Sequence, residues 1–135
     1  MEYKGRIRDR AGRTYVVSLD NDEEDDPDQI DVLDSKEESI GYVRFDIDKG
    51  EMSICDITIS EKEYRHCGLG TALLRYVIKW AKGRGVKTII GDVAPEMPGD
   101  KEWLLKWYSD NGFEILPKRP ESKISRAIAA IRMSL

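Results

Sequence analysis

The chain has 135 residues and a mass of 15.5 kDa, the size of one compact domain, and we expect residues 1–135 to form a single domain. Hydrophobic residues make up 40% and charged residues 36%, and the net charge of −4 argues against a protein that coats nucleic acid. One histidine and two cysteines are too few for a Cys/His zinc site or a disulfide framework, and the apolar runs are too short for a membrane span or a secretory signal. We therefore expect a reduced, cytoplasmic domain without a metal, a membrane partner or a nucleic-acid partner.

The first third of the chain predicts short β-strands joined by loops. Tyr15 to Leu19 is β-branched and apolar, and Ile30 to Leu33 gives a weaker strand signal. Between them, positions 20–28 hold seven acidic residues in nine. Such a block repels itself, so we expect a solvated loop there.

A β-hairpin is predicted next. Ile40 to Ile47 alternates with period two, a tight turn follows at 48–50, and Met52 to Ser60 forms the second strand. Strict alternation places one set of residues, Ile54, Asp56 and Thr58, on one face, and Cys55, Ile57 and Ile59 on the other. We expect Cys55 to pack in the core.

The apolar period changes to three and four residues after Ser60, which predicts an amphipathic helix from Gly68 to Lys82 that Gly83 and Gly85 end. A buried strand follows at 86–93. A second helix is predicted from Lys101 to Asp110, with Gly112 at its end and a short strand at 113–116. The tail, 122–135, fits either a helix or a strand. The whole predicts an α+β domain with helices packed on a sheet.

The run from Glu63 to Leu74 carries the clearest chemical signal. Gly68 and Gly70 stand at a strand-to-helix junction, where they let the backbone approach a large ligand. The first amides of the helix have no intrahelical acceptor, and with the helix dipole they suit a phosphate. Arg65 adds a positive charge. The alternative is an ordinary glycine turn that leads into a helix.

Residues 65–70, Arg-His-Cys-Gly-Leu-Gly, resemble the pyrophosphate loop of the GNAT N-acetyltransferase superfamily. Residues 107–114, Trp-Tyr-Ser-Asp-Asn-Gly-Phe-Glu, are similar to the ending of that family's last helix. The resemblance covers about residues 38–116. It implies a mixed, mainly antiparallel sheet that splays between its fourth and fifth strands, here 51–60 and 86–93, with acetyl-CoA as co-substrate in the cleft. It also implies that the family's first two helices are reduced or absent, because the region that replaces them is short and acidic.

The resemblance assigns roles to particular residues. Cofactor binding falls to backbone groups of the strand and of the loop, at Ile57, Thr58, Ile59, Arg65, His66, Cys67, Gly68, Leu69, Gly70 and Thr71. A strand amide would polarise the acetyl carbonyl. Tyr108 is the expected donor of a proton to the leaving thiolate, and Asp56 is the first candidate for the base that deprotonates the amine, followed by Glu51 and Asp92. The alternative for Tyr108 is a core aromatic beside Trp103, Leu104 and Trp107, and the alternative for each acid is a surface carboxylate.

Two departures keep a second function open. Lys101 stands where the family often has Asn, and Ile54 stands near the position of a strand Glu. We expect an N-acetyltransferase that moves an acetyl group to a primary amine by direct attack. The alternative is a non-catalytic acyl-CoA-binding or protein-interaction domain of the same fold. The acidic segment favours a cationic acceptor, either a small molecule or a peptide, and the sequence leaves a homodimer open.

Overall fold

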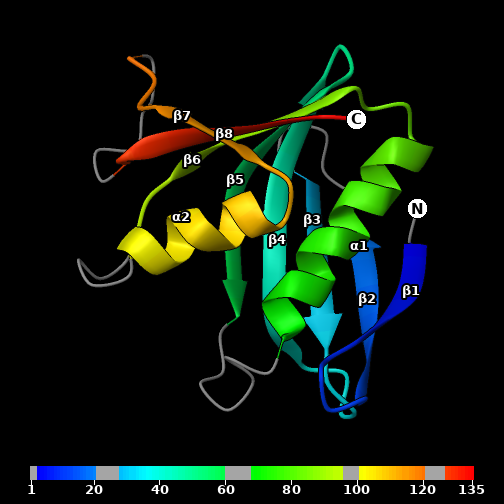
Figure 1. The fold of residues 1–135 in the computed structure, drawn as a ribbon. Coiled ribbons are helices and arrows are strands. Elements are labelled where there is room, and N and C mark those ends of the chain that lie inside the picture. Colours follow the sequence, from blue (N-terminus) through cyan, green and yellow to red (C-terminus); the bar gives the residue numbers. More distant parts are fainter. Residues whose placement is uncertain (1–2, 21–27, 60–67, 96–100, 121–126) are drawn as a thin grey trace.

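The computed structural model describes residues 3–20, 28–59, 68–95, 101–120 and 127–135, which form eight strands and two helices (Figure 1). In chain order these elements are β1 (Tyr3–Arg8), β2 (Thr14–Asp20), β3 (Asp28–Leu33), β4 (Ser39–Asp48), β5 (Glu51–Ile59), α1 (Leu69–Gly83), β6 (Thr88–Val93), α2 (Lys101–Asp110), β7 (Glu114–Pro117) and β8 (Ala129–Ser134). The strands make one sheet in the order β1-β2-β3-β4-β5-β6-β8-β7. Only β5 and β6 pair in parallel, so the mixed, mainly antiparallel α+β sheet is confirmed. No helix among the described residues is both long enough and apolar enough to span a bilayer.

Both helices cover the same face of the sheet, and the core lies between them and the strands (Figure 1). The apolar stripe of α1 is buried on this face at Leu69, Leu73, Leu74, Val77 and Ala81. It meets fully buried strand residues such as Phe45 and Met52. Among the described elements none covers the other face, which presents polar side chains of β4 and β5. We call this surface, which includes Tyr42, Asp56 and Thr58, the open face.

The N-terminal strand β1 was not predicted from the sequence, because its inward-facing positions, Gly5 and Ile7, supply only one apolar side chain. These positions face the helices. Gly5 lies against α1, where a Cβ would come within 2.8 Å of Tyr76 Cε2. The helix therefore sits directly on the backbone of β1.

The acidic segment joins β2 to β3. These strands pair with Asp20 opposite Gln29, so only residues 21–27 separate them, and those residues lie outside the described part of the chain. Because a helix averages about 10–14 residues, seven residues cannot hold two helices. The expected loss of the family's first two helices is confirmed for this connection.

A β-bulge interrupts the hairpin of β4 and β5. Arg44 pairs with Asp56, but the next residue of β4, Phe45, pairs with Ile54, so Cys55 is an extra residue in β5. The bulge reverses the alternation: Ile54 faces the core, whereas Asp56 faces the open face. The prediction that Ile54 and Asp56 share a face was therefore wrong. The core position predicted for Cys55 was also wrong, because the bulge exposes its side chain.

The sheet divides at the bulge. The pairing of β5 with β6 runs from Glu51 opposite Thr88 to Ile54 opposite Gly91 and ends there. The prediction of which two strands diverge was correct. They are the fifth and sixth strands of this chain rather than the fourth and fifth, because β1 adds a strand.

The remaining element ends agree with turn chemistry. Gly83 is the last residue of α1 rather than its stop, and the chain turns at Gly85, whose φ is +80°. The described part of the tail, residues 127–135, contains the strand β8, which lies between β6 and β7, so the helical alternative is wrong there. The second helix has the predicted bounds.

We predict that Gly5→Ala lowers the free energy of unfolding by about 1–3 kcal/mol, because the new methyl group forces Tyr76 and α1 away from β1. Urea unfolding measures the loss. Gly83→Ala is the control, since nothing lies within 4 Å of its Cβ position. A Tyr76→Phe background should reduce the loss; equal stability of Gly5→Ala and the parent would contradict the packing argument.

Candidate active site

The N-terminus of α1 has the features of an anion site. Gly68 is the N-cap in the left-handed region, with φ +85°, and no side-chain hydrogen bond caps the helix. The first helical bond runs from the Ala72 amide to the Gly68 carbonyl, at 3.0 Å, so the amides of residues 69–71 precede it and have no helical acceptor. The first turn contains no acidic residue. The positive end of the helix dipole is therefore not offset by its own first turn.

The structure shows which parts of the predicted loop are available to a ligand. Leu69 is fully buried, so only its backbone can serve. The Thr71 hydroxyl accepts a hydrogen bond from Trp107 Nε1 at 2.8 Å, which ties the start of α1 to α2. Arg65, His66 and Cys67 lie outside the described residues.

The end of β5 lies beside this helix start. A Cβ at Gly70 would lie 3.9 Å from both Ile59 Cγ1 and Trp107 Cζ2. Ile57 and Ile59 turn half-buried side chains to the core side, while Thr58 points to the open face. Since β6 pairs with β5 only as far as Ile54, its backbone supplies no partner to this stretch.

Asp56 is held in place on the open face by two hydroxyl groups. Its Oδ2 accepts from the Tyr42 hydroxyl at 3.0 Å, and its Oδ1 accepts from Thr58 Oγ1 at 3.1 Å. The hydrogen bond to Asp56 raises the pKa of Tyr42, which keeps that phenol protonated and donating. Sequence reasoning missed Tyr42, because the register set by the 48–50 turn would place it opposite Ile57, and only the bulge shifts it opposite Thr58.

Tyr108 lies on the helix side and is 4% exposed. Its ring packs edge-on against Trp107 and Phe113, with centroids 4.9 and 5.6 Å away. Burial raises the pKa of Tyr108 to about 12, and the negative charge of Asp56 contributes in the same direction. The phenol is therefore fully protonated at neutral pH.

The effect on the pKa of Tyr108 relates that residue to Asp56. Asp56 faces away from the helices, yet its charge affects the pKa of Tyr108, which belongs to α2 and is buried on the other side of the sheet. The carboxylate on the open face is therefore close enough to the phenol in the core to influence it electrostatically.

The other candidate bases are placed less favourably. Asp92 makes a two-pronged ion pair with Arg119, at 3.0 Å to Nε and 2.9 Å to a terminal nitrogen, and its side chain is 7% exposed. Glu51 begins β5, about 16 Å along the strand from Asp56. Cys55 is exposed at the bulge, but partial desolvation of its thiol and the nearby negative charge of Asp46 raise its pKa, which disfavours a thiolate nucleophile.

The aromatic residues of α2 divide between core and surface. Trp103 is 56% exposed and stacks on Trp107, with ring centroids 6.1 Å apart, so it is not a core neighbour of Tyr108 as the alternative for that residue implied. Trp107 is half-buried and bridges the two helices through Thr71. That bridge was missed, since no local sequence signal links residues 36 positions apart.

Comparisons with known proteins agree with the fold. The family model described as the acetyltransferase (GNAT) family matches residues 3–113. The GNAT domain of S. lividans PAT has a similar fold, with a TM-score of 0.73, 16% identity and coverage of 98% of this chain and 97% of that one. The ribosomal-protein-S18-alanine N-acetyltransferase from Escherichia coli has a TM-score of 0.63 and 17% identity over 83% of this chain and 71% of that one.

A third similar structure contains a ligand. The PaiA N-acetyltransferase from Thermoplasma acidophilum, in complex with coenzyme A, has a TM-score of 0.59 and 17% identity over 79% of this chain and 60% of that one. At these identities the similarity establishes the fold. No curated protein matches the chain.

We predict a loss of stability at alkaline pH that depends on Tyr108. An unfolded tyrosine ionises near pH 10, whereas the folded pKa is about 12, so between these values only the unfolded chain has lost the proton. Stability due to the neutral phenol is complete below pH 10 and falls by roughly 3 kcal/mol as pH rises to 12. Urea unfolding of the wild type and Tyr108→Phe across this range measures the difference.

The Asp56→Asn variant is the control for that measurement. It keeps the shape of the side chain and removes the charge that contributes to the shift, so the folded pKa of Tyr108 should fall. The Tyr108-dependent loss should still begin near pH 10, but it should end at a lower pH and be smaller in total. Parallel stability curves for the wild type and Tyr108→Phe would contradict the burial of this phenol.

Proposed function

Because the chain belongs to the GNAT family of acetyltransferases, we propose that it moves an acetyl group from acetyl-CoA to a primary amine. The observation that carries the proposal is the junction of β5 and α1. The pairing of β5 with β6 ends at Ile54, and the far end of β5 leads to the uncapped start of α1, where Gly70 lies beside Ile59.

This junction fits the two halves of CoA. An extended arm can add along residues 57–59 of β5 like a further strand, because β6 has turned away there. The arm then ends at the amides of residues 69–71, which suit a pyrophosphate. Gly70 leaves room for close approach of the phosphates to the helix backbone.

Direct attack needs a group on each side of the reacting carbonyl. Bound acetyl-CoA supplies a thioester, which a neutral amine attacks at its carbonyl carbon. On the open face, Asp56 binds the ammonium form and accepts its proton, directly or through water. On the helix side, the Tyr108 hydroxyl donates to the departing sulfur, and a backbone amide of β5 donates to the carbonyl oxygen. The products are an amide and free CoA.

The raised pKa of Tyr108 constrains its contribution. A phenol with a pKa of about 12 is a weaker acid than a thiol, whose pKa is about 8.5, so it stabilises the leaving thiolate chiefly as a hydrogen-bond donor. When Asp56 takes up a proton, the charge that helps raise this pKa disappears. Tyr108 then becomes a better acid at the moment the thiolate leaves.

We further propose that the acceptor approaches over the open face and is cationic. The family's two helices are lost from the β2–β3 connection, and the acidic segment replaces them. Asp56 adds a carboxylate, anchored by Tyr42 and Thr58, where an ammonium group would arrive. This chemistry suits a polyamine or a basic peptide.

The test of the function is release of free thiol from acetyl-CoA with a panel of amines. We expect turnover with a cationic primary amine, and we expect Tyr108→Phe to lower kcat by about 10²-fold, the lower end of general-acid effects, with little change in CoA affinity. The role of Tyr108 is tested by measuring kcat against pH for the wild type and for Tyr108→Phe. Identical profiles would reject the role of Tyr108. CoA binding without turnover of any amine would favour the non-catalytic alternative.

We predict that Gly70→Asp separates binding from folding. An acidic residue in the first turn stabilises a helix by about 0.3–1 kcal/mol, so the melting temperature should not fall, but the same charge repels the pyrophosphate. Calorimetry should show at least about a tenfold weaker Kd for CoA, corresponding to about 1.4 kcal/mol.

The matched control is Gly83→Asp, at the other end of α1, where a Cβ meets nothing within 4 Å. It makes the same change in net charge about 20 Å away and should leave the Kd for CoA unchanged. Equal affinities of the Gly70 and Gly83 variants would contradict a pyrophosphate site at this helix start.

A further inference from the structure

The turn between β1 and β2 is held by a buried carboxylate. Asp9 has a side chain with no exposed surface, and it accepts four hydrogen bonds. These come from the Ala11 amide at 2.9 Å, the Arg13 amide at 3.0 Å, Arg13 Nε at 2.8 Å and the Tyr15 hydroxyl at 2.9 Å. Although burial raises the pKa of Asp9, the hydrogen bonds from Tyr15 and Arg13 outweigh it and keep the pKa below its usual value. A short surface turn is thus fixed by an ionised side chain beneath it.

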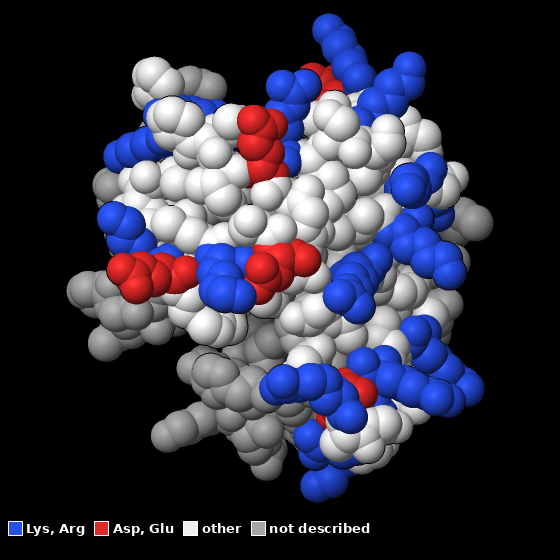
Figure 2. Space-filling model, viewed as in Figure 1, with Lys and Arg blue, Asp and Glu red and all other residues white. Residues whose placement is uncertain are grey.

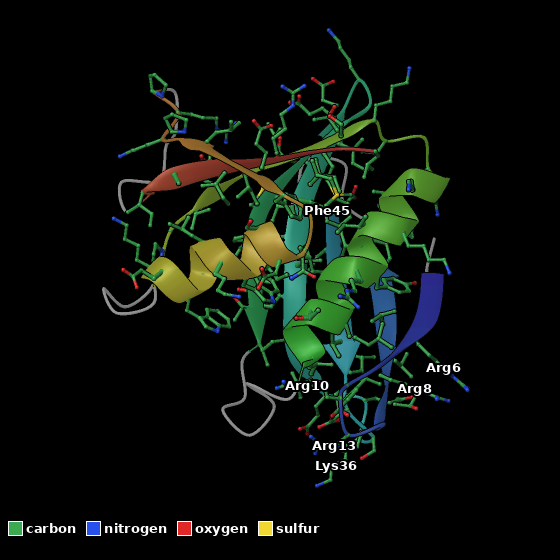
Figure 3. The ribbon with its side chains drawn as sticks, in the orientation of Figure 1. Arg6, Arg8, Arg10, Arg13, Lys36 and Phe45 are labelled. Atoms are coloured by element: carbon green, nitrogen blue, oxygen red, sulfur yellow. The ribbon has the colours of Figure 1, made fainter. Side chains whose placement is uncertain are left out.

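The residue that this turn presents is Arg10. Its side chain lies over Gly68, so that a Cβ on that glycine would come within 2.7 Å of Arg10 Cγ and 3.1 Å of Nε. Figure 3 shows Arg10 beneath the first turn of α1, while Arg6 and Arg8 project away from it. Two features therefore disfavour a larger residue at position 68: the φ of +85°, and the Arg10 side chain that occupies the space of a Cβ.

A cation at this position is unfavourable for the helix alone. The start of a helix is its positive end, and a neighbouring positive charge costs free energy where a negative one would stabilise. In α1 the first turn contains no acidic residue and no side chain caps it. Arg10 and the helix dipole therefore both contribute positive potential at the start of α1. Figure 2 shows that lysine and arginine gather on the α1 side of the molecule, although the net charge of the chain is −4.

We propose that Arg10 binds the pyrophosphate of CoA together with the amides of residues 69–71, and that Asp9 positions Arg10 for this purpose. The proposal rests on the proposed function, which places CoA at this helix start. A guanidinium group can donate two hydrogen bonds to one phosphate, and a diphosphate offsets both the arginine and the helix dipole. The binding site therefore includes a residue almost 60 positions before the glycine loop, on a turn that no local motif marks.

The experiment compares three ligands by calorimetry: CoA, dephospho-CoA, which keeps the pyrophosphate but lacks the 3′-phosphate, and pantetheine, which has no phosphate. Arg10→Gln should weaken CoA and dephospho-CoA equally, by about 10- to 100-fold, as expected for a hydrogen bond between charged groups. Pantetheine should bind as it does to the wild type. The difference between the variant and the wild type should shrink as salt rises.

Arg6→Gln is the matched control. It removes the same charge from the neighbouring strand, where the side chain is exposed and points away from α1. Its CoA affinity should stay within about twofold of the wild type. An equal loss in both variants would assign the effect to the overall field and overturn the proposal.

The positioning role of Asp9 needs a readout that a loss of stability alone does not move. In Asp9→Asn we expect a higher KM for acetyl-CoA with kcat and the KM for the amine unchanged. In the Arg10→Gln background, Asp9→Asn should have no further effect on the Kd for CoA. Additive losses in this double-mutant cycle would overturn the positioning role.

The remaining outcomes separate the two proposals. If the wild type binds CoA and Arg10→Gln binds it equally well, Arg10 has no role and the proposed function stands. If Arg10→Gln weakens CoA but not dephospho-CoA, the arginine reads the 3′-phosphate, and the pyrophosphate assignment is overturned. If the wild type binds neither nucleotide, both proposals fail.

Discussion

The extra residue at Cys55 is the constraint on which the site depends. By inserting one position into β5, the bulge reverses which side chains face the helices and coincides with the end of pairing to β6. Before it, β5 is a central strand with partners on both sides. After it, Ile57 still contributes to the core while Asp56 faces the open face. One local irregularity therefore creates both an available strand edge and a carboxylate beside it.

Asp56 lies on the open face of the sheet, whereas the buried Tyr108 lies on the helix side. Burial raises the pKa of Tyr108, and the negative charge of Asp56 adds to this effect, so the charge on one face influences the phenol on the other. Proton removal from an amine and proton donation to sulfur are then not independent events in the proposed reaction.

The N-terminal hairpin of β1 and β2 contributes to the other end of the proposed CoA site. Asp9 is the buried charged residue among the described side chains, and its hydrogen bonds all serve the β1–β2 turn or Tyr15. The turn carries Arg10 to Gly68, while Gly5 lets α1 rest on the backbone of β1. The strand that the sequence patterns did not reveal thus both supports the helix and adds a positive charge to its start.

Several elements were predicted correctly because their signals in the sequence are local. The periodicity and glycine stops of α2, the strands on either side of the 48–50 turn, and the glycine-rich start of α1 were predictable because each depends on neighbouring residues. The tertiary structure decided what depends on pairing between distant segments. The tail became β8 because β6 and β7 flank it, and Asp56 changed faces because β4 accommodates Cys55 as an extra residue. Arg10 reached Gly68 for the same reason: strand pairing and helix packing bring together residues far apart in the chain, and no local pattern records such a contact.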